Sequence, residues 1–378
     1  MRRTYFIWVV VGAILGLVCF LNLRSSNIPD ADSFYHLGHA RVYASQGITH
    51  SDFPWTQYSI IRTHKADIWY GFHILLLPLA LFKNPIYAIK CGTIVLSTLT
   101  ILLIAWSLRT VDRSRYIFWL ALFLTASAAV LFRLNMLRPH PLSLALTLVF
   151  FTTLIARKKS VEDEKKKLAF LAGIGFLSSW LHLALSWLPI LVYLVWMFWR
   201  IVLVKLLHKK EVIARIDWIE GGSILLGMIV GWIFRPHPIG ALKIAYVQVV
   251  QLSIEKIRGI PLKFGNELLP FNVVSFTAQL WPFVLLIALT CTAGYWLVFR
   301  SEKFRENQKK LAAHLTAFSL MVFFLLLTFI VAVRSLELFV AFAVVFSALV
   351  GAEVLPYISK KTLYKRLAIT LVVIQTVI

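Results

Sequence analysis

The residues with the greatest chemical potential lie in one polar stretch between residues 29 and 73. It opens with the sequence PDADSFYH and closes with HKADIWYGFH, and it brings acids, histidines and aromatic residues together in an otherwise apolar chain. Carboxylate and imidazole groups can take a proton from an attacking hydroxyl, or hold a divalent cation against a phosphate. This stretch is therefore the first candidate for a reactive site.

The composition is that of a membrane protein. Of the 378 residues, 60% are hydrophobic and only 15% are charged, whereas soluble domains carry about 25% charged residues. The net charge of +22 comes from basic residues between apolar runs that are long enough to cross a bilayer, about 20 residues each. The charge thus orients spans and gives no reason to expect a nucleic-acid partner. The three cysteines lie apart in apolar runs, so neither a disulfide framework nor a zinc site is indicated.

The basic residues predict the orientation of the first segments. Arg2 and Arg3 precede an apolar run over residues 5–23, which reads as an uncleaved first span with its N-terminus in the cytoplasm. The following segment, 24–84, is then the first outer loop. Its last apolar piece, 68–82, is too short to cross the membrane and is interrupted by Pro78. It is expected to be an interfacial or re-entrant helix.

The remaining apolar runs predict an all-α polytopic protein with about ten or eleven transmembrane helices. Residues 1–378 form a single transmembrane domain with a second long outer loop at 235–277. Most of the Lys and Arg residues then fall in short inner segments, as the positive-inside rule requires. The last run, 367–378, is about half a span long, so the chain is expected to stop inside an eleventh helix. The further spans are predicted at 85–108, 116–132, 141–156, twice within 168–207, 217–234, 278–299, 314–333 and 338–357.

The sequence DADSFYH, directly after the first span, resembles the type C (GT-C) membrane glycosyltransferase superfamily. The resemblance is to oligosaccharyltransferase-like and bacterial polyprenyl-phosphate-sugar-dependent members, in which an Asp followed by Tyr-His or Tyr-Arg opens the first outer loop. In those members a Trp-Tyr-x-x-His helix closes the loop, similar to WYGFH at 69–73. The sequence RSLE at 334–337 is similar to an Arg-x-x-Glu turn of bacterial members.

The resemblance implies an enzyme that moves a sugar from a polyprenyl-phosphate donor to a glycan, lipid or protein acceptor. It implies membrane lipids as further partners and a reaction on the outer face of a prokaryotic cytoplasmic membrane, although an endoplasmic reticulum lumen would give the same signs. Oligosaccharyltransferases carry a metal-binding acidic motif in the second outer turn and a WWDYG signature, and this chain lacks both. A divalent cation, Mg²⁺ or Mn²⁺, held by Asp30 is left as an open alternative.

Asp30 and Asp32 are the candidate catalytic residues, as the base that takes the acceptor's proton. The competing interpretation is structural: Asp30 and Ser33 cap a helix that begins near Asp32. His36 and His39 would share one face of that helix. The candidate substrate-binding residues are His36, Asp67, His73, Arg138, His140, Arg235, Glu267, Arg334 and Glu337.

Charge explains why the later residues are included. Arg138 and His140 lie in a turn, 133–141, that contains no acid, and cations without acidic partners suit a lipid-linked phosphate. Arg334 directly follows an apolar run and would be costly there unless it is paired. Two other functions remain open: a transporter or flippase of lipid-linked saccharides, and a non-catalytic scaffold. A transporter should carry charges near mid-span, and this chain keeps nearly all its charges at span ends, which favours the enzyme.

Overall fold

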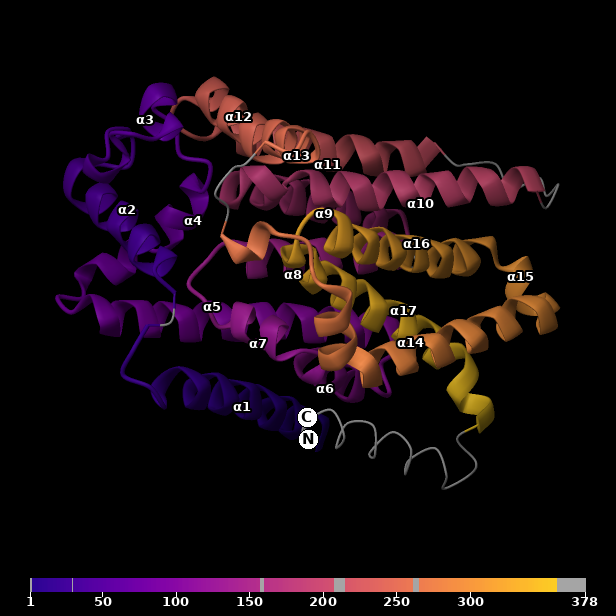
Figure 1. Cartoon of the computed structure of the whole chain (residues 1–378). Coiled ribbons are helices and arrows are strands. Elements are labelled where there is room, and N and C mark those ends of the chain that lie inside the picture. The colour runs from indigo at the N-terminus through magenta and orange to yellow at the C-terminus, as the bar shows by residue number, and fades with distance from the viewer. Residues whose placement is uncertain (1, 29, 157–159, 207–214, 261–264, 359–378) are drawn as a thin grey trace.

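The structure is a computed structural model of the chain and describes residues 2–28, 30–156, 160–206, 215–260 and 265–358. Within these ranges every regular element is a helix, which confirms the all-α prediction. The long helices lie alongside one another in a bundle (Figure 1). They are α1 (Arg2–Leu23), α5 (Pro85–Val111), α8 (His140–Ile155), α9 (Val161–Leu181), α10 (Trp187–Leu206), α11 (Arg215–Ile233), α14 (Val273–Arg300), α16 (Gln308–Ile330) and α17 (Leu336–Ile358).

Short helices gather at one end of the bundle (Figure 1). In the first loop they are α2 (Asp32–Gln46), η1 (Pro54–Thr56), α3 (Ile60–His64), α4 (Tyr70–Leu75) and η2 (Leu77–Leu81). The later ones are η3 (Leu183–Leu185), α12 (Pro238–Tyr246), the π-helical η4 (Val247–Gln251), α13 (Leu252–Ile257), η5 (Asn266–Leu268) and η6 (Val333–Ser335), whereas α15 (Glu302–Glu306) lies at the other end.

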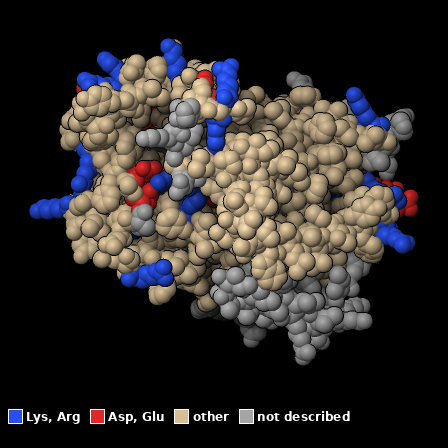
Figure 2. Space-filling view, viewed as in Figure 1, with Lys and Arg blue, Asp and Glu red and all other residues tan. Residues whose placement is uncertain are grey.

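Five helical segments of the described chain are long and apolar enough to cross a membrane, or seven if two bent helix pairs each count as one span. This indicates an integral membrane protein. Figure 2 agrees, because the centre of the visible face is mostly free of charged side chains. The count of ten or eleven spans stays a prediction, because helices such as α8 are shorter than the usual crossing length. The expected eleventh helix, 367–378, lies outside the described residues.

The expected span at 116–132 is not one helix. It is divided into α6 (Tyr116–Thr125) and α7 (Ala128–Leu134), which meet at an angle of 100°. Ser127 between them has an extended backbone (φ −158°, ψ 132°) that interrupts the helical hydrogen bonds. The two helices together are apolar enough to count as one bent span, so the span stays a prediction. Helix α7 leads directly into the turn that carries Arg138.

The segment 68–82 is a short α-helix followed by a 3-10 turn. Pro78 lies in the 3-10 turn, where its ring removes a backbone donor and prevents a longer helix. Neither piece is long enough to cross a membrane. The prediction that this segment does not span is confirmed, and α4 instead packs against α2 and α9.

Helix α8 is the centre of the bundle. Every residue from His140 to Leu154 is buried, on all sides of the helix, as expected for a helix enclosed by others. Phe151 packs edge-on against Phe342 of α17, and Phe342 stacks on Phe324 of α16, with ring centres 6.1 and 5.7 Å apart. This packing holds the C-terminal half of α8, and the buried residues from His140 onward enclose its N-terminal half.

Glycine residues set the distance between α9 and α11. A Cβ atom added to Gly227 would overlap the carbonyl of Ala172, and one added to Gly231 would overlap the carbonyl of Phe176. The Gly-x-x-x-Gly spacing of Gly227 and Gly231, which predicts close helix contact, thus lies at the interface between α9 and α11.

Substituting Gly227 should therefore separate α9 from α11. We expect Gly227→Leu to lower the melting temperature of the purified protein, with a loss of stability of roughly 1–3 kcal/mol or more. Gly222→Leu, on the same helix, is the matched control, because a Cβ added to Gly222 would meet no other atom within 4 Å. Equal melting temperatures for the two variants would contradict the close packing.

Candidate functional site: an arginine–carboxylate network beside a histidine cluster

Asp30 is placed by the start of helix α2. One carboxylate oxygen accepts the backbone N–H of Asp32 at 3.3 Å, and the other accepts the hydroxyl of Ser33 at 2.9 Å. The helix begins at Asp32, as the structural interpretation expected. Asp30 is 4% exposed, so its charge requires a partner.

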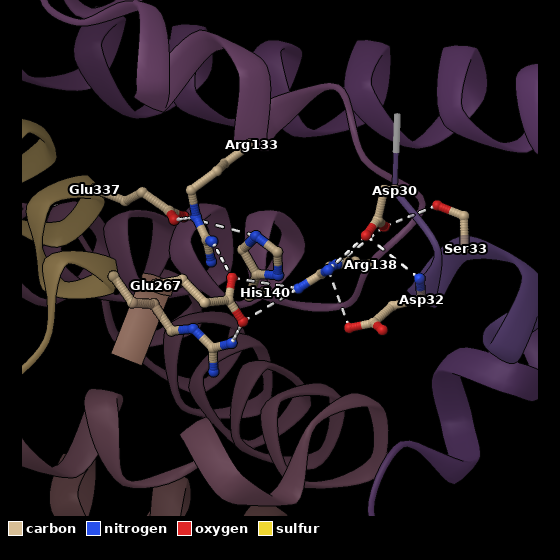
Figure 3. Close-up of polar contacts among 9 residues, drawn as sticks. Asp30, Asp32, Ser33, Arg133, Arg138, His140, Glu267 and Glu337 are labelled. Atoms are coloured by element: carbon tan, nitrogen blue, oxygen red, sulfur yellow. Dashed lines mark hydrogen bonds and ion pairs between the residues drawn. The ribbon is translucent and has the colours of Figure 1, made fainter. Parts of the chain in front are cut away.

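Arg138 supplies that partner. Its Nε donates to Asp30 at 2.9 Å, and one terminal nitrogen bonds the other oxygen of Asp30, which makes the pair bidentate (Figure 3). The same terminal nitrogen lies 3.0 Å from Asp32, and the other terminal nitrogen lies 3.4 Å from Glu267. One guanidinium thus holds three carboxylates, two from the first loop and one from the segment before α14.

The network extends through Glu267 to the α16–α17 connection. Arg133 donates to Glu267 at 2.6 Å, and its Nε bonds Glu337. Arg334 also bonds Glu267, while His140 Nε2 lies 3.8 Å from Glu337. We call Asp30, Asp32, Glu267, Glu337, Arg133, Arg138 and Arg334 the arginine–carboxylate network.

The arginines keep Asp30 and Glu267 ionised. Burial alone would raise the pKa of Asp30, but the hydrogen bonds and charge of Arg138 hold that pKa below its ordinary value. Burial acts in the same direction on Glu267, whereas the charges of Arg334 and Arg133 lower its pKa to about 2. Asp30 and Glu267 therefore face the guanidinium groups as charged carboxylates.

The expectation that the 133–141 turn holds cations without acidic partners was wrong. The turn itself contains no acid, but the fold brings it Asp30, Glu267 and Glu337 from other segments. A buried guanidinium group without an acidic partner would strongly destabilise the fold. Arg133 and Arg138 therefore need partners, and these come from segments that are distant in the sequence.

A second cluster lies between α2 and α4. Asp67 accepts the backbone N–H of Trp69 at 2.8 Å on one oxygen; on the other it accepts the hydroxyl of Tyr43 at 2.9 Å and His73 Nδ1 at 2.5 Å. His73 Nε2 in turn lies 2.8 Å from His36 Nδ1. With His39, which is also buried, these residues form the histidine cluster. Burial would raise the pKa of Asp67, but His73, His39 and the Trp69 N–H lower it.

The histidine cluster has the spacing of a metal site but not the hydrogen bonds of one. Ligand atoms of His39, Asp67 and His73 lie within 4.8 Å of one another. However, the indole N–H of Trp55 donates to His39 Nε2 at 3.2 Å, and an indole can only donate. The proton of neutral His39 must therefore be on Nδ1, the atom that a metal would need. The described residues fit a hydrogen-bonded carboxylate better than an ion.

The divalent cation that was left as an open alternative at Asp30 fits no better. A guanidinium already occupies both carboxylate oxygens of Asp30 and also contacts Asp32. Mg²⁺ and Mn²⁺ bind through oxygen ligands, and both oxygens of Asp30 already accept bonds from Arg138. A divalent cation could bind Asp30 only by displacing this arginine.

The predicted site residues thus divide between two adjoining groups. The network contains Asp30, Asp32, Arg138, Glu267, Arg334 and Glu337 with His140 beside it; the histidine cluster contains His36, Asp67 and His73. Arg235 belongs to neither. Its guanidinium donates to the backbone carbonyls of Asp67 at 3.2 Å and Trp180 at 3.3 Å, so its contacts join the first loop to the end of α9.

Sequence reasoning missed two members. Arg133 bridges Glu267 and Glu337, and its only local signal is its place five residues before Arg138 in the same turn. Tyr43 donates to Asp67; it lies seven residues after His36, a spacing that places both on one helical face. Helical periodicity would therefore have found Tyr43.

A cavity of about 510 Å³ adjoins the network. It lies between α1, α5 and α7, and it reaches Asp30 and Ser33. Its polar lining includes Asn22, Arg24, Ser25, Asn27, Lys90, Thr93 and Asn135, and its apolar lining includes Leu21, Ile28, Ile89, Leu131, Phe132 and Met136. Charged side chains also gather in a hollow at the α2–α4 end of the face shown in Figure 2. The site therefore joins a largely apolar space to a strongly charged one.

In comparisons with known proteins, the sequence matches no family model and no curated protein. The function proposed below is therefore supported by the side chains, their contacts and the adjoining cavity.

The shifted pKa of Glu267 predicts a pH-dependent contribution to stability. Its folded pKa of about 2 lies below the ordinary 4.5, so the contribution is present above about pH 4.5 and is lost as the pH falls towards 2. We expect Glu267→Gln to melt below the wild type at neutral pH, and the difference to shrink at about pH 3. Because the side chain is 30% exposed, the difference will be modest. A difference that is the same at both pH values would contradict this assignment.

Proposed function

We propose that this chain is a membrane glycosyltransferase of the type C fold. It transfers a sugar from a polyprenyl-phosphate donor to an acceptor hydroxyl on the outer face of a prokaryotic cytoplasmic membrane. The observation that carries the proposal is the cavity with apolar walls that reaches buried Asp30. Arg138 pairs with Asp30 and, through Glu267, is linked to Arg133 and Arg334. An isoprenoid chain suits the apolar walls, and guanidinium groups suit its phosphate.

Two arginines of the network are accessible to an entering anion. Arg138 and Arg334 have side chains that are 13% and 41% exposed, and both contact Glu267, which is itself 30% exposed. An entering phosphate can replace the more exposed carboxylates, Asp32 and Glu267, as the partner of these guanidinium groups. Asp30 keeps its bidentate contact and so fixes the orientation of Arg138.

In the reaction, the acceptor oxygen attacks the anomeric carbon while the bond from that carbon to the phosphate oxygen breaks. Negative charge grows on the departing polyprenyl phosphate, where Arg138 and Arg334 would stabilise it. Asp30 as the base stays a prediction. Its oxygens already accept bonds from Arg138, Ser33 and the Asp32 N–H, which favours a role in positioning Arg138.

The contacts along α8 favour the enzyme over a transporter. A second cavity, of about 640 Å³, lies at the C-terminal end of α8 and the N-terminal end of α16, away from the arginine–carboxylate network. Its lining includes Lys167, Arg200 and Glu220. Between the two cavities α8 is buried on every side. A transporter would need its central site to alternate between the two faces, and the packed middle of this bundle gives no such site among the described residues.

Transfer should depend on the ion pair between Asp30 and Arg138. We expect Arg138→Lys and Asp30→Asn each to reduce transfer from polyprenyl-phosphate sugars by roughly 10²-fold, because each breaks the bidentate contact. The assay uses purified protein with a panel of donors and acceptors, and release of polyprenyl phosphate is the readout.

The control for these variants is Arg258→Lys, at an exposed arginine that pairs only with Glu255 among the described residues. It should keep the wild-type rate. Undiminished transfer by Asp30→Asn would refute the role of Asp30. Translocation of the donor across vesicles without transfer would establish the flippase instead.

Metal removal gives a separate prediction. Because Arg138 supplies the positive charge at Asp30, we expect EDTA to leave the transfer rate unchanged and added Mn²⁺ not to raise it. A loss with EDTA that Mg²⁺ or Mn²⁺ restores would show that a cation displaces Arg138 from Asp30.

A further inference from the structure

The proposed reaction requires a base for the acceptor's proton, and the histidine cluster offers one. This inference rests on the proposed function. His36 lies three residues after Ser33 and four after Asp32, on the same face of α2. Ser33 is itself bonded to Asp30. The histidine cluster therefore begins one helical turn from the network.

The hydrogen bonds fix where the protons of the cluster lie. Asp67 is a carboxylate and can only accept, so the bond at 2.5 Å requires a proton on His73 Nδ1. Neutral His73 then has a lone pair on Nε2, and the bond at 2.8 Å requires a proton on His36 Nδ1. This assignment, made from the hydrogen-bond partners, leaves Nε2 of His36 as the unprotonated end of the chain.

The ring of His36 is held firmly in this orientation. Tyr35, Trp69 and Phe72 pack edge-on against it, with ring centres 5.5, 5.5 and 5.1 Å away. The described residues give its Nε2 no hydrogen-bond partner. A fixed imidazole with a lone pair that no neighbour uses has the form of a general base.

The chain also places the resulting charge favourably. When His36 Nε2 gains a proton, its Nδ1 proton can pass to His73 Nε2, which moves the positive charge to the ring beside Asp67. Burial, His73, His39 and Arg138 lower the pKa of His36, whereas Asp67 raises it. The transfer thus moves the positive charge toward a negative neighbour. The carboxylate of Asp67, which is bonded to His73 Nδ1, then stabilises the positive charge on His73.

We propose that His36 is the catalytic base of the transfer, and that His73 and Asp67 are positioning residues that relay its proton. As the acceptor oxygen bonds the anomeric carbon and the bond to phosphate breaks, the hydroxyl proton passes to His36 Nε2. It is returned to water or to the departing phosphate after the sugar has moved.

His39 provides the matched comparison. It lies one turn further along α2, is equally buried, and stacks on His73 with ring centres 4.5 Å apart. However, Trp55 occupies its Nε2, and its Nδ1 is 4.0 Å from Asp67, too far for a hydrogen bond. It therefore has the bulk of His36 but no basic nitrogen to offer.

The test compares transfer by the wild type, His36→Gln and His39→Gln in the purified full chain. We expect His36→Gln to lower kcat by roughly 10²–10⁴-fold with KM changed little, and His39→Gln to stay within about three-fold of the wild type, because it removes no proton acceptor. In His36→Ala, added imidazole should restore part of kcat. Equal losses for the two glutamine variants, or a loss in KM alone, would overturn the inference.

A second measurement tests the relay without using activity. In protein labelled with ¹⁵N-histidine, the His73 Nδ1 proton should give a strongly downfield NMR signal that disappears in Asp67→Asn. Absence of that proton in the wild type, or stoichiometric zinc bound to His73, would overturn the relay. A wild type that transfers no sugar from any donor refutes the proposed function, whereas an active wild type with a fully active His36→Gln refutes this inference alone.

Discussion

A charge buried in an apolar bundle must be paired, and the bidentate contact of Arg138 with Asp30 meets that requirement between segments far apart in sequence. Arg138 can reach Asp30 only if the α7–α8 turn lies against the start of α2. Asp32 and Glu267 complete its coordination. Removing either member would leave a charge with incomplete compensation, so the geometry of the site and the folding of this end of the bundle depend on the same contact.

The helices around this contact supply rigidity in different ways. Helix α8 is enclosed on all sides and holds His140 in place, whereas α9 and α11 approach closely through glycines. Arg235 then joins the end of α9 to the backbone of Asp67. The histidine cluster is thus attached to the bundle through backbone carbonyls, and its imidazoles remain available for one another.

The sequence predicted much of this arrangement because some of its signals are local. Apolar run length gave the helices, Pro78 and a short run gave the non-spanning segment 68–82, and residue type gave most members of both clusters. What it missed depends on long-range contact. The bend at Ser127 and the acidic partners of Arg133 and Arg138 arise from packing between segments that no local pattern relates. The partners of Arg235 were not predicted for the same reason: they are backbone carbonyls, which leave no trace in residue type.

The turn after α7 also sets the depth of the charged site. Ser97 of α5 donates to the carbonyl of Leu134 at 2.7 Å, and Ser97 lies about 18 Å along the helix axis from Pro85 at 1.5 Å per residue. The turn then runs back toward Pro85, because Leu137 packs against Gly92, about 10 Å along the axis from Pro85. Arg138, the next residue, therefore lies below the end of α5. A phosphate carried by a lipid could meet Arg138 while the lipid chain stays within the hydrocarbon layer. The energy of lifting an isoprenoid anchor into water, about 0.8 kcal/mol for each CH₂ group exposed, would then not have to be spent during the reaction.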